Sequence, residues 1–288
     1  MYIATLIALE RLTRGDISAA RDALGGAGEP DWVEAERACD FAIEGDPEGA
    51  RALEGLLPGV DLVVQPQAGR RKRLLVADMD MTMIGQECLD ELADYAGLRD
   101  QVASVTEQAM RGDLDFEAAL DARVALLAGL DEAAIHRCHA ERVRLTPGAR
   151  TLVRTMRANR AYCLLVSGGF SLFADRVAAE IGFDAAVSNR LHIEGGRLAG
   201  TVGRPILGAQ GKKQALVDAA AARGIALADT LAVGDGANDI PMIAAAGLGI
   251  AYRAKPAAAA AADARIEAND LTALLYAQGY SRKEWVAD

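Results

Sequence analysis

The feature that most constrains the fold is a set of short apolar runs, each of which stops abruptly at a polar residue. Asp78 follows the run 74–77, and Ser167 follows the run 162–166. Gly234 and Asp235 follow the run 230–233. Long amphipathic stretches separate them, and this alternation is typical of strand–helix–strand units around a parallel sheet. Because the carboxyl ends of parallel strands face one crevice, we expect these polar residues to meet there.

The same pattern divides the chain into three regions. Residues 1–70 begin with an alternating apolar segment and a helical stretch, and they are expected to form a small α+β unit without catalytic residues. Residues 84–145 are helical in pattern and too long for an ordinary crossover, which predicts a helical cap inserted over the crevice. The core is then expected to comprise residues 71–83 and 146–288, including a hairpin that turns at Gly195 and Gly196.

Composition excludes several classes of protein. With 51% apolar and 25% charged residues, the 288-residue chain is neither disordered nor fibrous. Its 31 basic and 41 acidic residues give a net charge of −10, which argues against gripping a nucleic-acid backbone or docking on anionic lipid. The longest stretch without a charged residue, 161–174, is shorter than the roughly 20 apolar residues that span a bilayer. No secretory signal is evident, so a cytoplasmic location is expected.

The cysteines and one basic run complete the survey of local features. Cys39, Cys88, Cys138 and Cys163 are far apart in sequence and lack the close spacing of a zinc or dithiol site, so we expect packed, reduced thiols. The four consecutive basic residues 70–73 could form a binding patch. We favour the other interpretation, a solvated lead-in to the next strand.

Carboxylates dominate the strand ends. Asp78 and Asp80 lie two residues apart in a loop, where one can attack while the other transfers protons, and Asp235 and Asp239 add two more. At an effective dielectric of 20, two carboxylates about 4 Å apart repel by about 4 kcal/mol. Only protonation or a bound cation makes such a cluster tenable, and ligand sets made of oxygen alone favour Mg²⁺.

Groups suited to phosphate follow the second run. Ser167, Gly168 and Gly169 precede a helical stretch, so a hydroxyl and closely approaching backbone N–H groups can surround phosphate oxygens. Lys212 or Lys213 adds a positive charge. Each of these features alone is common in solvated loops, turns and surfaces, but their order along the chain is informative.

In this order the motifs resemble those of the haloacid dehalogenase superfamily, in the segments 78–82, Ser167, Lys212 and 234–239. Within it, residues 78–88, Met110, 115–117, 122–124, 166–170 and 234–242 resemble the phosphoserine phosphatase family, and the similarity extends from about residue 74 to the C-terminus. The resemblance implies an α/β fold with a Rossmann-like core, a parallel sheet and an inserted helical cap. Residues 1–70 loosely resemble the ACT-like segment that often precedes these phosphatases.

The resemblance also implies roles in the core. Asp78 would attack the phosphorus of O-phospho-L-serine and form an aspartyl-phosphate, while Asp80 would protonate the leaving serine and then activate water. Mg²⁺ would be held by the side chains of Asp78 and Asp235 and by the backbone carbonyl of Asp80. The implied phosphate-binding residues are Thr82, Ser167, Gly168, Lys212 and Asn238, with Asp239 in a supporting role.

Further roles are implied for the cap. Glu87 would pair with the substrate ammonium and Arg123 with its carboxylate, a task that suits guanidinium. Met110 and Phe116 would pack in the cap and close the site. Met81 stands where the family usually carries Ser, and we expect it to fill apolar space under the cap rather than shape the substrate pocket.

The implied activity is Mg²⁺-dependent hydrolysis of O-phospho-L-serine, the last step of L-serine biosynthesis. The protein would act on a small molecule, and neither nucleic acid nor a membrane is expected as a partner. A homodimer is left open. One alternative is a phosphatase or phosphotransferase for another small ester, such as phosphohomoserine. A second is a catalytically silent serine-sensing protein, although the presence of both Asp78 and Asp80 argues against it.

Overall fold

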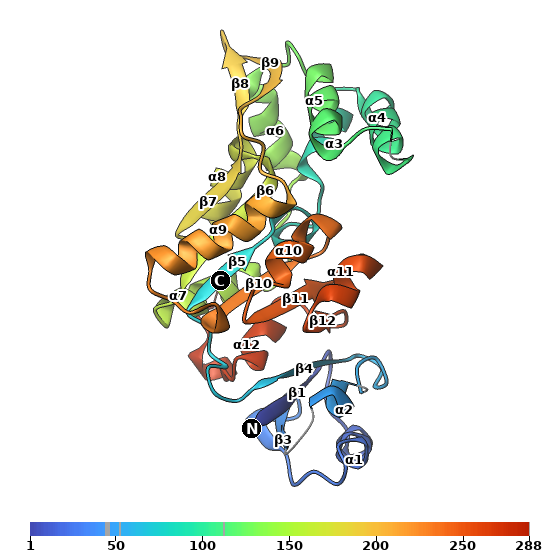
Figure 1. Ribbon diagram of the computed structural model, residues 1–288, viewed down its shortest axis with the longest axis vertical. Helices are drawn as coiled ribbons and strands as arrows, with labels where there is room; N and C mark the ends of the chain where they lie inside the picture. The colour runs from blue at the N-terminus through green and yellow to red at the C-terminus, as the bar shows by residue number, and fades with distance from the viewer. Residues whose placement is uncertain (44–46, 52, 112, 288) are drawn as a thin grey trace.

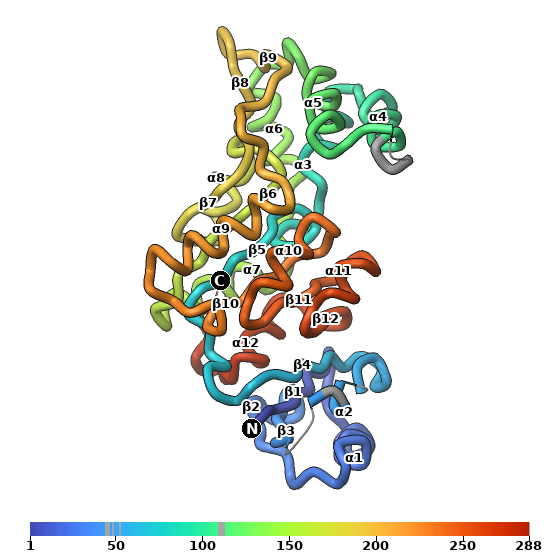
Figure 2. Tube along the Cα trace, viewed as in Figure 1, coloured from blue at the N-terminus to red at the C-terminus, as the bar shows by residue number. Residues whose placement is uncertain are grey.

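The computed structural model describes residues 1–43, 47–51, 53–111 and 113–287 of the chain. A small N-terminal sheet lies at one end of the long axis, a parallel sheet with its helices lies in the middle, and a helical segment lies at the other end (Figures 1 and 2). The predicted α/β fold is therefore confirmed. No helix in the described ranges has the length and apolar character needed to cross a membrane.

The central sheet is parallel and has the strand order β12-β11-β10-β5-β6-β7. Its strands are β5 (Leu74–Ala77), β6 (Tyr162–Phe170), β7 (Ala185–Asn189), β10 (Thr230–Gly234), β11 (Leu248–Tyr252) and β12 (Ala264–Ile266). The three predicted runs form β5, β6 and β10, which are neighbours in the middle of this order. Their carboxyl ends therefore meet, as the sequence predicts.

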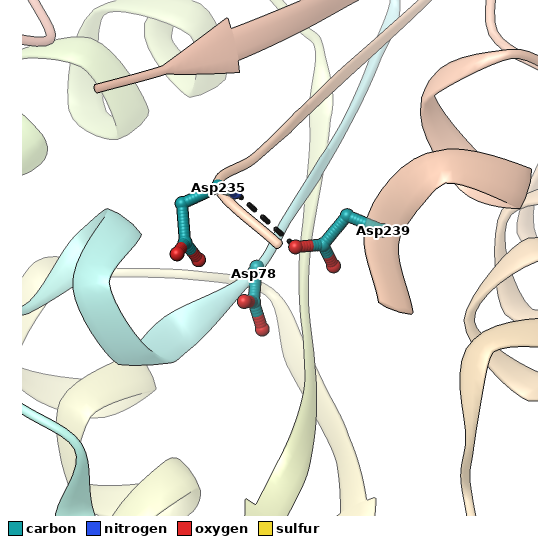
Figure 3. A group of neighbouring side chains, drawn as sticks. All are labelled: Asp78, Asp235 and Asp239. Atoms are coloured by element: carbon teal, nitrogen blue, oxygen red, sulfur yellow. Dashed lines mark hydrogen bonds between the residues drawn. The ribbon is translucent and has the colours of Figure 1, made fainter. Parts of the chain in front are cut away.

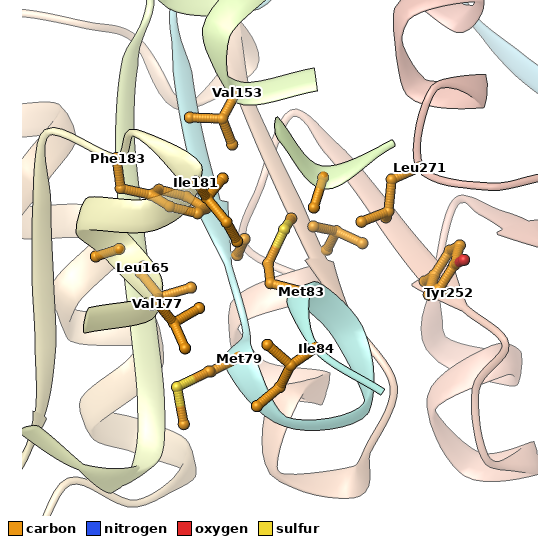
Figure 4. Close-up of a cluster of buried hydrophobic side chains, with 14 of the residues drawn as sticks. Met79, Met83, Ile84, Val153, Leu165, Val177, Ile181, Phe183, Tyr252 and Leu271 are labelled. Atoms are coloured by element: carbon orange, nitrogen blue, oxygen red, sulfur yellow. The ribbon is translucent and has the colours of Figure 1, made fainter. Parts of the chain in front are cut away.

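Helices cover both faces of this sheet. Successive strand residues point to opposite sides, and all four residues of β5 are buried, so both faces need a covering layer. Leu75 and Ala77 belong to a buried cluster with α7 (Ala149–Ala158) and α8 (Ser171–Ile181), part of which Figure 4 shows. On the other face, the side chains of Leu74 and Val76 pack with α9 (Ala209–Ala222) and with α10 (Ile240–Ile243). The remaining helices of this region are α11 (Pro256–Ala261) and α12 (Ala273–Ala277), and short turns form η2 (Leu227–Asp229), η3 (Ala237–Asp239) and η4 (Arg282–Glu284).

The helical segment between β5 and β6 contains α3 (Cys88–Tyr95), α4 (Arg99–Arg111), α5 (Phe116–Leu126) and α6 (Glu132–Arg142). The side chains of Asp115 and Asp131 cap α5 and α6, each accepting a backbone N–H at 2.8 Å. The predicted hairpin is present as β8 (Leu191–Glu194) and β9 (Arg197–Val202). It bridges to Asp131 and contacts α5, so it packs on the cap although the sequence analysis grouped it with the core.

The N-terminal unit is an antiparallel sheet of order β2-β3-β1-β4, flanked by two helices. One sheet face packs in its own apolar cluster. The other face contributes Ile7, Ala38 and Val63 to the core cluster, so the unit shares a buried interface with the core. Its elements are β1 (Tyr2–Ala8), α1 (Arg14–Ala23), β2 (Asp31–Glu34), β3 (Ala38–Ile43), α2 (Pro47–Arg51) and β4 (Val60–Pro66).

The basic run between this unit and β5 is not simply a solvated lead-in, and that interpretation is wrong for Arg70 and Lys72. The Arg70 guanidinium donates to both carboxylate oxygens of Asp40, at 2.5 and 3.0 Å. Lys72 is buried, and its Nζ donates to the carbonyl of Ala228 at 2.9 Å. Arg70 also donates to the carbonyl of Ala277 in the core, so it is held between the two units, whereas Lys72 is held by the core alone. The four cysteines are free and buried, as predicted.

Candidate active site

The loop after β5 is the centre of the site. Asp78 follows β5 directly, and its backbone N–H donates to the carbonyl of Val233 on β10 at 3.0 Å. The next residues form a tight turn, η1 (Met79–Met83), in which Met81 has a left-handed backbone with φ 55°. The turn ends with the Ile84 N–H donating to the carbonyl of Met79. This geometry holds Asp78 and Asp80 at the carboxyl edge of the sheet.

A pocket opens at this edge, between the core and the cap. Asp78, Asp80 and Asp235 line its core side, and Glu87 and Arg123 line its cap side, although these residues are far apart in sequence. The other lining residues are Leu89, Phe116, Leu120, Ser167, Gly168, Gly169, Phe170, Gly236, Asn238 and Lys255. The structure therefore brings most of the candidate site residues to one pocket.

Lys212 joins Asp78 to the loop after β10. Its Nζ donates to Asp78 Oδ1 at 2.6 Å and to Asp239 Oδ1 at 2.7 Å, and its side chain has no exposed surface. Burial lowers the pKa of Lys212, but the charges of Asp78 and Asp239 outweigh this effect and hold the pKa above its usual value. Lys212 is thus a fixed cation beneath the pocket, while the neighbouring Lys213 is exposed.

The carboxylates of Asp78, Asp235 and Asp239 converge, as Figure 3 shows, with one oxygen of each within 4.8 Å of the others. Asp239 is already engaged, because its Oδ2 accepts the N–H groups of Asp235 and Gly236 at 3.2 and 3.0 Å. Burial and the charge of Asp239 raise the pKa of Asp235. Closely spaced carboxylate oxygens with this mutual repulsion fit a hard divalent cation, with Asp78 and Asp235 as the available donors.

Asp80 has the properties of a proton-transfer group. Burial and the charge of Glu87 raise the pKa of Asp80 to about 7. One of its oxygens accepts the Cys88 N–H at 3.4 Å. A Cβ on Gly169 would lie 3.2 Å from the other oxygen, a tight contact that glycine avoids. A carboxyl with a pKa close to neutrality can both give and take a proton near physiological pH.

The loop after β6 contributes small groups to the pocket. Ser167 is 1% exposed, and its hydroxyl accepts the Gly169 N–H at 2.9 Å. Asn189, which the sequence analysis did not identify, supports this loop from β7. Its Nδ2 donates to the carbonyl of Gly168 at 2.8 Å, and its Oδ1 accepts the Leu207 N–H at 2.7 Å. Gly168 is thereby tied to the segment that precedes α9.

Thr82 is not among the described residues that line the pocket. Thr82 is fully buried, and its hydroxyl has no hydrogen-bond partner in the described part of the chain. Met110 belongs to α4, but its side chain lies outside the described residues. Asn238 does line the pocket, in the turn that also contains Asp239.

Phe116 is one of the cap side chains that reach the core. Ring atoms of Phe116 lie 3.5 Å from the position that a Cβ on Gly208 would take and 3.9 Å from that on Gly168. Arg123 projects from α5, and its Nε donates to the carbonyl of Ala119 at 3.3 Å. Phe116 thus spans the boundary between cap and core, while Arg123 keeps N–H groups for a ligand.

Two side chains depart from the sequence analysis. Met81 does not fill apolar space under the cap, because its side chain is 43% exposed. Its place at the left-handed corner of the turn leaves it outside the packed interior. Lys255 lines the pocket but was missed. It follows β11, a strand that the sequence analysis did not predict, so the gathering of polar residues after parallel strands did not identify it.

Comparison with known proteins agrees with this geometry. The family profile of haloacid dehalogenase-like hydrolases matches residues 75–244. A phosphoserine phosphatase of Streptomyces coelicolor is 45% identical over 86% of this chain and 62% of its own length. A phosphoserine phosphatase of Albidiferax ferrireducens is 44% identical over 70% of this chain and 88% of its own length. The chain spans only 55% to 63% of the Streptomyces, Mycobacterium tuberculosis and Archaeoglobus fulgidus relatives.

Solved structures give the same picture. A haloacid dehalogenase family hydrolase from Salmonella enterica superposes with a TM-score of 0.86 at 31% identity, covering 96% of this chain and 98% of that one. A substrate-bound phosphoserine phosphatase complex superposes with a TM-score of 0.66 at 38% identity, covering 71% of this chain and 97% of that one. The first similarity spans nearly the whole of both chains.

Proposed function

Because the chain belongs to the haloacid dehalogenase-like hydrolase family, we propose that it is a phosphoserine phosphatase, which hydrolyses O-phospho-L-serine to L-serine and phosphate. One observation carries the proposal: a single pocket combines Asp78 and Asp80 from the core with Glu87 and Arg123 from the cap. The first pair suits phosphoryl transfer, and the second pair complements the two charges of an amino acid. The proposed setting is the cytoplasm and the last step of L-serine biosynthesis.

The proposed reaction has two displacements at phosphorus. A carboxylate oxygen of Asp78 attacks the phosphorus, the phosphorus–oxygen bond to serine breaks, and the departing serine oxygen takes the proton of Asp80. Asp80, now ionised, removes a proton from a water molecule, whose oxygen attacks the same phosphorus. The aspartyl-phosphate bond then breaks, which restores Asp78 and releases phosphate. Asp80 ends protonated, ready for the next substrate.

Other core residues hold the transferring group in this proposal. Ser167 and the backbone of Gly168 would bind phosphate oxygens, together with Asn238, whereas the fully buried Thr82 lies outside this pocket wall. Lys212 keeps Asp78 oriented and supplies positive charge beneath it. Mg²⁺ held by Asp78, Asp235 and the backbone carbonyl of Asp80 would neutralise charge on the phosphoryl group. Asp239 holds Lys212 and the loop of Asp235 in place.

The cap supplies the proposed selectivity. Glu87 would bind the ammonium of the substrate, and the guanidinium of Arg123 would bind its carboxylate. Phe116, and Met110 from α4, would close the pocket over the bound molecule. The domain boundaries proposed with this scheme are residues 1–70, a core of 71–83 and 146–288, and a cap of 84–145.

Phosphate release from a panel of esters tests the proposal. Phosphoserine should be the preferred substrate over phosphothreonine, phosphohomoserine and sugar phosphates, and chelation of Mg²⁺ should stop its turnover. A preference for phosphohomoserine would replace the proposal with its nearest alternative. Absence of turnover with every ester, together with serine binding in calorimetry, would support a sensing protein instead.

A further inference from the structure

Lys255 lines the pocket from the core, directly before α11. Its backbone N–H donates to the carbonyl of Asp235 at 2.9 Å, which fixes its place beside the acidic loop. Its ammonium forms no hydrogen bond or ion pair within the described part of the chain. Lys212 differs, because two carboxylates already hold it. Lys255 therefore supplies a positive charge that no described residue pairs directly, and this charge lowers the pKa of both Glu87 and Asp235.

Glu87 is the corresponding unpaired charge on the cap. It precedes α3, and its carboxylate makes no hydrogen bond or ion pair with any described residue. Burial and the charge of Asp235 raise the pKa of Glu87, and Lys255 opposes this rise more strongly than Arg123 does. The carboxylate thus lies in an acidic environment, with Lys255 as its main balancing charge from the core.

Substrate binding would increase the importance of Lys255. In the proposed function, the substrate carboxylate occupies Arg123, which removes that guanidinium as a balancing charge for Glu87. A carboxylate has two oxygens and about four acceptor positions, so it can accept one ammonium on each side. We propose that Lys255 is a positioning residue: its ammonium orients the Glu87 carboxylate across the pocket, so that this carboxylate receives the amino group of the substrate.

This inference rests on the proposed function, and a double-mutant cycle at saturating Mg²⁺ tests it. Lys255→Met removes the charge and keeps most of the length of the side chain. Lys255→Gln is a second neutral variant. Either change should raise KM for phosphoserine by about tenfold, with a much smaller change in kcat. In a Glu87→Gln background, the same change should raise KM by less than about twofold, because the carboxylate to be oriented is gone.

Three controls separate this role from a structural one. Lys255→Arg keeps the charge and should restore most of the affinity. Lys213→Met removes an exposed lysine from the same protein and should leave KM unchanged. Hydrolysis of p-nitrophenyl phosphate, which has no amino group, should fall far less than hydrolysis of phosphoserine. Thermal unfolding of each variant identifies any loss that comes from misfolding.

The outcomes are distinguishable. Equal rises in KM with and without Glu87, or equal losses on both substrates, would overturn the positioning role while leaving the proposed function intact. Failure of the unmodified protein to hydrolyse phosphoserine would overturn the proposed function, and this inference with it. A dependence of the Lys255 effect on both Glu87 and the substrate amino group would establish it.

Discussion

Lys212 places its Nζ 2.6 Å from Asp78 Oδ1, at a position without solvent access. The same ammonium holds Asp239, so Lys212→Met would leave two buried carboxylates without their cation. Removing one partner of a buried pair typically costs about 3–5 kcal/mol. We expect a loss of unfolding free energy near the lower end of that range, because Asp78 can take up a proton. Urea unfolding without metal measures it, and Lys213→Met is the control; equal stability of the two variants would contradict the prediction.

Asp78→Asn should reduce phosphate release to background. An amide is a poor nucleophile and a weaker metal ligand than a carboxylate, yet its oxygen can still accept the Lys212 hydrogen bond, so the fold should remain. Phosphate release and circular dichroism measure the two effects. Asp175→Asn, at an exposed position on α8, is the control. Turnover at the unmodified rate would rule out covalent catalysis by Asp78.

The raised pKa of Asp80 predicts a dependence of stability on pH. Burial raises this pKa to about 7, so the unfolded chain releases the Asp80 proton at lower pH than the folded protein does. Unfolding free energy without metal should therefore fall as pH rises from about 4 to about 7, by up to about 4 kcal/mol from this group. Asp80→Asn lacks the titration and should gain stability relative to the unmodified protein over that range.

Urea unfolding of both proteins in a chelator, at several pH values, measures this difference. A stability difference that does not change with pH would show that Asp80 titrates normally. The same variant should lose activity by about 10²–10⁴, the usual contribution of one general acid and base.

Substitutions of the cap residues should lower kcat/KM more for phosphoserine than for an ester without amino-acid groups. Glu87→Gln and Arg123→Ala each remove a charge that complements the amino-acid part of phosphoserine, while the groups around Asp78 stay in place. We expect kcat/KM for phosphoserine to fall by about 10²-fold, equivalent to about 3 kcal/mol, and that for p-nitrophenyl phosphate to change little. Steady-state kinetics on both esters test this prediction. Comparable losses of kcat/KM on the two esters would assign these residues a structural role.

Local patterns were enough to predict the centre of the site. The apolar runs that end at Asp78, Ser167 and Asp235 are β5, β6 and β10, and their adjacency follows from parallel pairing. The turn at Gly195 and Gly196 likewise fixed the hairpin. These features depend on residues close together in sequence, so periodicity and turn chemistry were sufficient.

Features set by packing between distant segments could not be predicted in this way. Lys255 reaches the pocket because β11 pairs with β10, and no pattern in the sequence fixed that order. The burial of Lys72 depends on core residues far along the chain, because it donates to Ala228 and Gln278. Met81 has an apolar side chain, which favours a buried position, but the left-handed turn leaves it exposed. Each depends on three-dimensional relationships that a single sequence leaves open.

The last prediction concerns Asp61, a buried residue of β4 that binds the core segment after β12. Its Oδ1 accepts the N–H groups of Glu267 and Ala268 at 2.9 and 3.0 Å, and its Oδ2 accepts that of Asn269 at 2.9 Å. The Asn269 side chain also bonds Asp61 and the carbonyl of Ile7. Asp61 is therefore the main polar contact of this part of the interface.

Asp61→Ala would leave buried backbone donors without acceptors, and each such group costs about 1–3 kcal/mol. We expect a loss of about 3 kcal/mol or more, seen in thermal unfolding as one transition at lower temperature, because the unit and the core share apolar residues. Asp31→Ala, at an exposed site on β2, should unfold like the unmodified protein. A separate early transition, with the core melting unchanged, would mean that the N-terminal unit folds independently and that Asp61 does not couple it to the core.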